Sequence, residues 1–238
     1  MPKNINISIA GLKINIEYKY DFMNRFCRQY IIENQADSDI CVSTSDKEIE
    51  SENASVPSAS AEVCESLCIY RNVAEKLPDF NCFVFHGAAI TCDKNGYIFT
   101  APSGTGKTTH INLWKKYLGD RVDIVNGDKP VIRCPNNAGC TVFGTPWCGK
   151  EGLHKNRSAP LNAVCILKQS KINNMVKLDN KTAVKYLMRQ VYLPKNENAL
   201  NRTLSLLGNL IESTPVYLLE CDISKQAFDI AYNTLTNI

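Results

Sequence analysis

A short loop pattern carries the clearest chemical signal in the sequence. Residues 101–109 read Ala-Pro-Ser-Gly-Thr-Gly-Lys-Thr-Thr, which fits the phosphate-binding loop pattern with alanine in place of its usual first glycine. An apolar run at 97–99 precedes the loop and an amphipathic stretch at 110–118 follows it, which predicts a strand and then a helix. Backbone N–H groups of such a loop, together with the positive end of the helix, bind phosphate oxygens. The pattern therefore predicts nucleotide binding.

The residues of the loop have distinct expected roles. Lys107 is expected to reach the β- and γ-phosphates, and the Thr108 hydroxyl to ligate Mg²⁺. The glycines let the backbone curl around phosphate oxygens. ATP and Mg²⁺ are the expected cofactors, although the pattern alone does not separate ATP from GTP or pyrophosphate. The predicted nucleotide-binding residues are Ser103, Gly104, Thr105, Gly106, Lys107, Thr108 and Thr109.

Asp128 and His86 are the candidate partners of the loop in phosphoryl transfer. Asp128 follows an apolar strand about twenty residues after the loop, where P-loop proteins place a metal-binding carboxylate. We therefore expect Thr108 and Asp128 to be the metal ligands, the alternative being an aspartate that only begins a turn. His86 lies in an apolar β stretch, and is either a core histidine or a group that orients a carboxylate or stabilises γ-phosphate charge. The candidate catalytic residues are thus Lys107, His86 and Asp128.

An irregular stretch rich in glycine and proline holds further cations. Lys150 and Arg157 are candidate substrate-binding residues that would clamp phosphate or an acidic substrate, the alternative being a solvated basic loop. Trp147, between a proline and a glycine-containing segment, is expected to be exposed. His110 and His154 are expected to be surface or helix residues.

The predicted elements indicate an α/β protein, with an N-terminal α+β lobe at 1–80 and a P-loop core at 81–238. In the lobe, the apolar pattern predicts a hairpin over 5–18, a helix over 22–31 capped by Asp21, a short strand at 39–42, a surface loop or exposed hairpin over 47–60, and a helix over 61–77. In the core, it predicts one β stretch over 83–90, an Asn-Gly hairpin turn within 93–96, strands at 122–125, 131–134, 140–143, 161–167, 175–178 and 216–219, an irregular segment over 144–160, and helices at 182–191, 199–212 and 227–235.

Composition narrows the partners and the compartment. The net charge of +3 is too small to argue for nucleic acid, and no apolar run reaches the roughly 18 residues of a membrane-spanning helix. The N-terminus lacks the apolar core of a signal peptide, so we expect a cytoplasmic protein with neither nucleic acid nor membrane as partner. Because the cysteine count is odd and no export signal is found, the eleven cysteines are expected to be reduced, mostly buried thiols. Their spacings fit zinc sites poorly. Assembly into a homo-oligomer stays open.

The order of the motifs resembles the HPr kinase/phosphorylase family and the related ATP-dependent phosphoenolpyruvate carboxykinases. The resemblance covers residues 83–167 well and is closest to small HPr-kinase-like proteins, some of which phosphorylate a peptide serine. It rests on His-Gly at 86–87, Ser-Gly-Thr-Gly-Lys-Thr-Thr-His at 103–110 with Leu113-Trp114, Asp-Lys-Pro at 128–130, and Gly-Thr-Pro-Trp-Cys-Gly-Lys at 144–150.

The resemblance implies a phosphoenolpyruvate-carboxykinase-like P-loop core, made of a mixed β-sheet with flanking helices, and an ATP- and Mg²⁺-dependent kinase. It also implies that His86 assists catalysis and that Lys107 and Thr108 hold phosphate and metal. Asp128 matches the second residue of the acidic pair of the family. That pair is normally Asp-Asp, whereas this chain has Gly127-Asp128.

The main hypothesis is a kinase that transfers the γ-phosphate of ATP to a Ser/Thr hydroxyl of a peptide or protein, with Asp128 and His86 orienting or deprotonating the acceptor. Gly127 motivates an alternative, a nucleotide-binding sensor or regulatory protein with impaired catalysis. A small-molecule kinase is a further alternative. The arginine-glycine signature and the C-terminal helical extension of longer HPr kinases are missing, which argues against HPr itself as the substrate.

Overall fold

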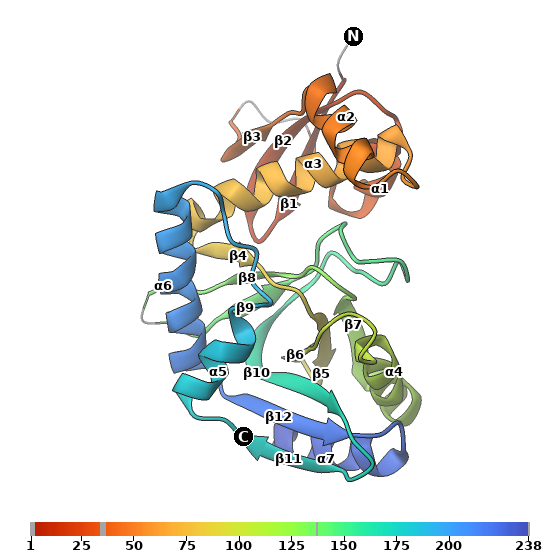
Figure 1. The fold of residues 1–238 in the computed structure, drawn as a ribbon, viewed down its shortest axis with the longest axis vertical. Helices are drawn as coiled ribbons and strands as arrows, with labels where there is room; N and C mark the ends of the chain where they lie inside the picture. The colour runs from red at the N-terminus through yellow and green to blue at the C-terminus, as the bar shows by residue number, and fades with distance from the viewer. Residues whose placement is uncertain (1–2, 34–36, 137, 238) are drawn as a thin grey trace.

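Two β-sheets organise the chain (Figure 1). The computed structural model describes residues 3–33, 37–136 and 138–237, and within these ranges the strands form one sheet of three strands and one of nine. Helices flank the sheets, so the predicted mixed α/β architecture with flanking helices is confirmed. In these same ranges, no helix combines the length and the apolar character that a membrane crossing needs.

The smaller sheet lies at the N-terminal end of the molecule, drawn in red and orange in Figure 1. β1 (Lys3–Ile9) and β2 (Leu12–Tyr18) form the predicted antiparallel hairpin, and β3 (Ile40–Val42) pairs in parallel with β2. Alternate isoleucines of the hairpin are buried, because the period of a strand points them all to the face that packs on α3 (Ala61–Lys76). The sheet and α3 thus share one apolar core.

The first helix of the lobe is shorter than predicted. α1 spans only Phe22–Phe26, and a 3-10 turn at Arg28–Tyr30 follows it. Asp21 precedes α1, but its side chain makes no capping hydrogen bond with the described residues of the helix. Apolar spacing continued through the 3-10 turn, which explains why the pattern predicted a single longer helix.

The polar stretch over 47–60 is not a loop or hairpin, as predicted, but contains the helix α2 (Asp46–Ser55). A capping box starts this helix, because the Ser45 side chain accepts from the backbone N–H of Glu48 and the Glu48 carboxylate accepts from the backbone N–H of Ser45. α2 has few apolar residues, yet it packs on α3 with Ile49 buried between them.

The larger sheet runs in the order β4-β8-β9-β10-β6-β5-β7, and β12 pairs with both β10 and β11 beyond that path. β6 and β12 lie parallel to β10, whereas the other described pairs are antiparallel. β10 begins inside the segment predicted to be irregular. The strands are β4 (Cys82–Val84), β5 (Ala88–Cys92), β6 (Asn95–Thr100), β7 (Val122–Asn126), β8 (Val131–Arg133), β9 (Thr141–Phe143), β10 (Ser158–Gln169), β11 (Asn174–Lys177) and β12 (Val216–Cys221).

The single β stretch predicted over 83–90 is in fact two strands, β4 and β5, which pair with different neighbours. Between them Phe85 forms an isolated bridge with Val191, so His86 lies in a break between strands rather than inside one. The hairpin turn that follows β5 also differs from the prediction. Asp93 and Lys94 make it, with φ of 48° and 73°, and the Asn-Gly pair already belongs to β6.

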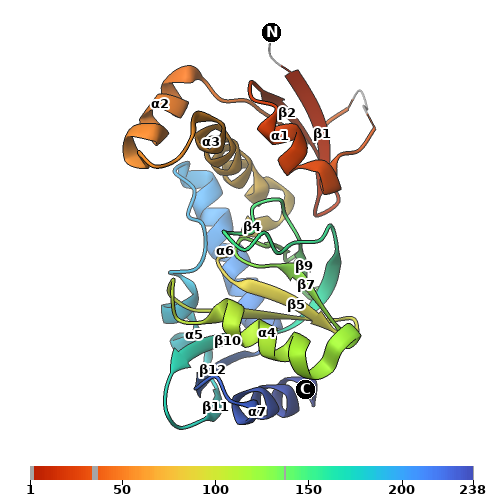
Figure 2. The ribbon, with the colours of Figure 1, turned by 90° about the vertical axis from the view of Figure 1, so that its right-hand side faces the viewer.

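Helices cover both faces of the larger sheet, as Figures 1 and 2 show, with α6 and α5 along one flank and α4 on another. α4 (Lys107–Leu118) and α7 (Lys225–Thr236) pack around the buried Trp114 on one face. α5 (Asn180–Leu187) and α6 (Glu197–Ser213) pack on the apolar core of the other face. The predictions of these four helices are confirmed.

The cysteines correct one expectation. Cys134 and Cys140 form a disulfide in the connection between β8 and β9, so the prediction of reduced thiols is wrong for this pair. The other cysteines are free, and all of them except Cys41 are buried. The sequence did not predict this disulfide. The two cysteines are six residues apart and come together only because β8 and β9 pair side by side.

Candidate functional site

The loop that connects β6 to α4, residues 101–106, is shaped to receive an anion. Gly104 and Gly106 have φ of 78° and 111°, in the left-handed region that glycine enters freely. Among the described residues other than Gly104 and its two chain neighbours, no heavy atom lies within 4 Å of the position that a Cβ would take at Gly104. Gly106 is the N-cap of α4, and no described side chain caps the first N–H groups of that helix. These donors therefore face an open concavity at the positive end of the helix dipole.

Lys107 is buried at the start of α4. Its Nζ donates a hydrogen bond of 2.9 Å to the backbone carbonyl oxygen of Ala101, so the side chain folds back along the loop. Burial lowers the pKa of Lys107 below the usual 10.5, and the nearby Asp128 carboxylate partly opposes that shift. A phosphate at the loop would stabilise this buried ammonium in the same way.

Asp128 is held at the end of β7. The Asn126 Oδ1 accepts the backbone N–H groups of Asp128 and Lys129, at 2.8 and 2.7 Å, which fixes this turn. The Asp128 carboxylate lies 3.3 Å from His86 Nε2 and forms an ion pair with Lys129. On the other side of the ring, His86 Nδ1 lies 2.9 Å from Gln190 Oε1. An imidazolium in this place can donate to both oxygens.

Opposing effects set the pKa of Asp128. Burial alone would raise it, but the hydrogen bonds from His86 and Lys129, with their charges, outweigh burial and hold the pKa well below the usual 3.8. The carboxylate is therefore ionised at neutral pH. An ionised carboxylate can bind a cation or orient a hydroxyl group by accepting its hydrogen bond.

Sequence patterns do not point to Gln190 as part of this site. It lies 104 positions from His86, and the segment after α5 brings it there because the His86 backbone N–H donates to the Gln190 carbonyl oxygen at 2.6 Å. This contact is set by tertiary structure and leaves no local signal. Lys129 directly follows Asp128, and that adjacency was an available signal for the ion pair.

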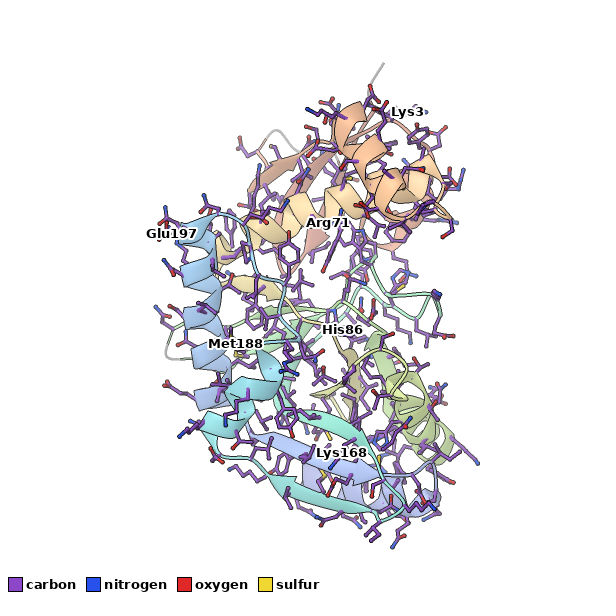
Figure 3. All side chains as sticks on the ribbon, in the orientation of Figure 1. Lys3, Arg71, His86, Lys168, Met188 and Glu197 are labelled. Atoms are coloured by element: carbon purple, nitrogen blue, oxygen red, sulfur yellow. A yellow bond between two sulfur atoms is a disulfide. The ribbon has the colours of Figure 1, made fainter. Side chains whose placement is uncertain are left out.

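One cleft, with a volume of ≈ 810 Å³, brings most of the predicted site residues together. In Figure 3, His86 lies near the middle of the molecule, between the labelled Arg71 and Lys168. The predicted residues that line the cleft are His86, Ser103, Gly104, Gly106, Lys107, Thr108, Thr109, Asp128 and Lys150. Thr105 faces other cavities, which lie on the far side of the loop. Arg157 lies apart, since it lines a separate depression and pairs with Asp123.

The residue before Asp128 is closed in by a neighbouring loop. A Cβ at Gly127 would lie 3.0 Å from the Cys148 carbonyl oxygen and 3.4 Å from the Leu153 Cβ. The Gly127 backbone N–H also donates to the Leu153 carbonyl oxygen at 2.8 Å. The segment from Cys148 to Leu153 thus occupies the space where a side chain at position 127 would begin.

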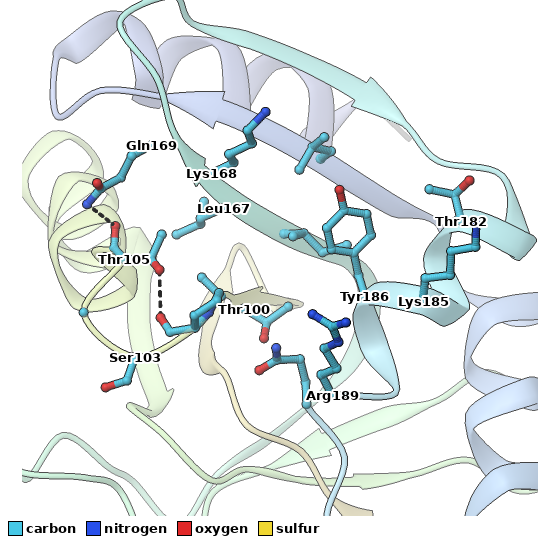
Figure 4. Close-up of a pocket in the computed structure, with 16 residues that line it drawn as sticks. Thr100, Ser103, Thr105, Leu167, Lys168, Gln169, Thr182, Lys185, Tyr186 and Arg189 are labelled. Atoms are coloured by element: carbon cyan, nitrogen blue, oxygen red, sulfur yellow. Dashed lines mark hydrogen bonds between the residues drawn. The ribbon is translucent and has the colours of Figure 1, made fainter.

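Another cavity of ≈ 840 Å³ lies beyond the loop, at the carboxyl end of β10 (Figure 4). Ser103 and Gly104 line both this cavity and the cleft, so the loop separates the two spaces. In the close-up, Tyr186 and the Arg189 guanidinium point into this cavity. Neither residue was singled out from the sequence, because an isolated polar residue in α5 or in the turn after it carries no distinctive pattern.

Trp147 is more buried than predicted, and the two remaining histidines have different surroundings. Trp147 is buried, and its Nε1 donates to the Ser66 carbonyl oxygen of α3 at 3.0 Å, so the expectation of an exposed tryptophan is wrong. His110 is a residue of the helix α4, which is one of its two predicted alternatives, and it is buried there. His154 is half-buried, with its ring stacked on that of Tyr30. These burials depend on contacts between segments far apart in the sequence.

Comparison with known proteins gives one family. A family model described as SynChlorMet cassette protein ScmC matches residues 58–230, which is more than half of the chain. A search among curated proteins found no match. Among solved structures, the Hpr(Ser) kinase/phosphatase from Coxiella burnetii matches with 10% sequence identity and a TM-score of 0.36, over 65% of this chain and 88% of that chain. A likeness at this level does not bear on chemistry.

Proposed function

The chain belongs to the family of SynChlorMet cassette protein ScmC, and we propose that it is an ATP- and Mg²⁺-dependent phosphotransferase acting on a Ser/Thr hydroxyl of a peptide or protein. The observation that carries this proposal is that Lys107, Thr108 and the His86–Asp128 pair line one cleft. Phosphoryl transfer needs a phosphate cradle, a metal holder and a group that orients the acceptor. In this cleft Lys107 belongs to the phosphate cradle, Thr108 and Asp128 are the candidate metal holders, and the His86–Asp128 pair could orient the acceptor.

The residues present fit a nucleotide with its metal ion. The open concavity at Gly104 and the uncapped start of α4 suit phosphate oxygens, and the buried Lys107 ammonium suits their charge. Thr108 and Asp128 would hold Mg²⁺, which uses one or two protein oxygens together with substrate phosphates. When bound, Mg²⁺ would neutralise charge on the β- and γ-phosphates. For this purpose Asp128 would exchange its ion pair with Lys129 for the metal ion.

In the proposed step, Asp128 accepts the proton of the acceptor hydroxyl while that oxygen forms its bond to the γ-phosphorus. The bond from this phosphorus to the β–γ bridging oxygen breaks, and ADP leaves with the electron pair. His86 keeps the Asp128 carboxylate in position through its Nε2 contact. Lys107 offsets the negative charge on the transferred phosphoryl group. Lys150 lines the same cleft and is a candidate for the same purpose.

The nucleoside is proposed to lie beyond the loop, over the carboxyl ends of β10 and β12. Ligands of open α/β sheets bind outside the carboxyl ends of the strands. Lys168 and Gln169, at the end of β10, line both cavities on that side of the loop, and the Gln169 side chain donates to the Thr105 carbonyl oxygen. A phosphoenolpyruvate-carboxykinase-like topology of the core remains part of this proposal.

A nucleotide-binding regulator without transfer activity is the second candidate. The packing of Cys148 and Leu153 against Gly127 favours it, because backbone and side-chain atoms fill the place where the other acidic residue of the pair would begin. In that case the loop and Lys107 would bind nucleotide, and Asp128 would serve only to hold the metal ion.

The test is transfer of labelled γ-phosphate from ATP to serine-containing peptides, with nucleotide affinity measured on the same preparation. We expect transfer by the wild-type protein, and loss of both ATP binding and transfer in Lys107→Ala with the thermal unfolding profile retained. Tight nucleotide binding without transfer to any peptide or protein would overturn the kinase and favour the regulator. Unchanged ATP affinity in Lys107→Ala would contradict the role of the loop.

A further inference from the structure

The cleft has a second wall, which comes from the N-terminal lobe. Phe22 and Phe26 of α1 and Val63 and Leu67 of α3 line the cleft together with the glycine-containing loop. In Figure 1, α1 and α3 lie above α4. All four side chains are only half-buried, so each leaves apolar surface facing the cleft. We call these four residues the apolar wall.

The apolar wall is tied to the polar side of the site. The Phe26 ring packs edge-on against Trp147, with 6.2 Å between the ring centroids, and Trp147 Nε1 bonds to the Ser66 carbonyl oxygen of α3. Lys129, the ion-pair partner of the site carboxylate, lies 5.8 Å from the centroid of the Tyr70 ring, also on α3. The wall and the carboxylate therefore keep a set position relative to each other.

The direction of transfer places the acceptor, not the nucleoside, against this wall. Lys107 and Thr108, which serve the terminal phosphates, line the cleft but neither cavity beyond the loop. The terminal phosphate of a bound nucleotide therefore faces the cleft. Acceptor and leaving oxygens lie roughly in line across the transferred phosphorus, so the acceptor must approach from the cleft side.

We propose that the apolar wall binds a large apolar side chain of the acceptor peptide, next to the residue that carries the hydroxyl group. This inference rests on the proposed function for the identity of the occupant. Binding is favoured in proportion to the apolar surface of these side chains that a ligand removes from water. A cleft of ≈ 810 Å³ is large enough for a drug-sized ligand, so it has room for an apolar side chain beside the hydroxyl-bearing residue. The N-terminal lobe thus selects the substrate, and the core supplies the chemistry.

Binding of two fluorescent peptides tests this proposal. Both carry a central serine in a glycine-alanine background; leucine flanks the serine in one, and asparagine in the other. Fluorescence anisotropy with the full chain and a non-hydrolysable ATP analogue gives their affinities. We expect the leucine peptide to bind roughly tenfold more tightly, the discrimination typical of an apolar pocket. Leu67→Asn should bring the ratio of affinities close to one, and the near-isosteric Val63→Thr should lower it in part.

Leu204→Asn is the matched control, because Leu204 is exposed on α6 and is not among the residues that line the cleft. It should leave the peptide preference unchanged. Equal affinities of the wild-type protein for the two peptides, no binding of either, or a preference that survives Leu67→Asn would overturn the apolar wall. Phosphate transfer is measured in parallel. If Leu67→Asn abolishes the leucine preference but the wild-type protein transfers no phosphate, the binding role of the apolar wall is supported and the proposed kinase activity is refuted.

Discussion

Asp128 shows how much a single carboxylate depends on its neighbours. The Asn126 side chain accepts a hydrogen bond from the Asp128 backbone N–H and fixes the turn. The Asp128 carboxylate forms an ion pair with Lys129 and contacts His86 Nε2. The sequence predicts Asp128 as a site residue from its place after an apolar strand, and in the structure it lines the same cleft as Lys107. It does not predict that Gln190 contacts the far side of the His86 ring, because the contact depends on the path of the chain after α5.

At the residue scale, Gly127→Asp is expected to destabilise the protein instead of simply restoring an acid. The new Cβ would lie 3.0 Å from the Cys148 carbonyl oxygen, so the neighbouring loop must move. Overpacking of this kind costs about 1–3 kcal/mol. Gly127→Ala is the control, since it adds the same Cβ without charge. Denaturant unfolding measures both variants; an aspartate variant as stable as the wild-type protein would contradict the close packing seen at this position.

At the element scale, α4 carries a pH-dependent contribution to stability. His110 is buried and accepts a hydrogen bond from Trp114 Nε1 at 3.3 Å, and within the described residues its Nδ1 has no hydrogen-bond partner. Burial lowers the pKa of His110 from 6.5 to about 4. Between these values the unfolded chain binds the proton and the folded chain does not, so stability is fully present above pH 6.5 and falls as the pH falls.

The expected loss is at most about 1.4 kcal/mol per pH unit across this window. Unfolding free energies of the wild-type protein and His110→Gln, measured from pH 7 to 4.5, check it. The free-energy difference between the two proteins should change steadily in favour of the glutamine variant as the pH falls. Parallel pH profiles would show that His110 titrates alike in the folded and unfolded chains.

Elements with strong periodicity were predictable, and those set by tertiary contacts were not. The helix after the loop and the three C-terminal helices were predicted from the spacing of their apolar residues, and in the structure those residues form the buried face of each helix. α2 was missed because its mean character is polar, although the capping box from Ser45 to Glu48 was a readable local signal. The break at His86 had no such signal, since the apolar run continues through it and only strand pairing divides it.

At the scale of the whole molecule, Trp147 joins the N-terminal lobe to the larger sheet. It belongs to the segment beside the cleft, yet it packs between Phe26 and Tyr70 and bonds to α3. Trp147→Ala should cost about 3–5 kcal/mol of unfolding free energy, as other large core truncations do. Trp147→Phe keeps an aromatic ring and loses the Nε1 hydrogen bond, so it should cost less. Denaturant unfolding decides, and a cost below about 1 kcal/mol for alanine would contradict this role.

The most direct test of the central claim compares the wild-type protein with Asp128→Asn. Asparagine keeps the size of the side chain but has no negative charge and cannot accept the proton of the acceptor. We predict that the rate of labelled phosphate transfer falls by roughly 100-fold or more, while affinity for ATP without Mg²⁺ stays close to that of the wild-type protein. Loss of the ion pairs with His86 and Lys129 should lower the unfolding temperature but keep a single cooperative transition. Transfer by Asp128→Asn at the wild-type rate would contradict the account.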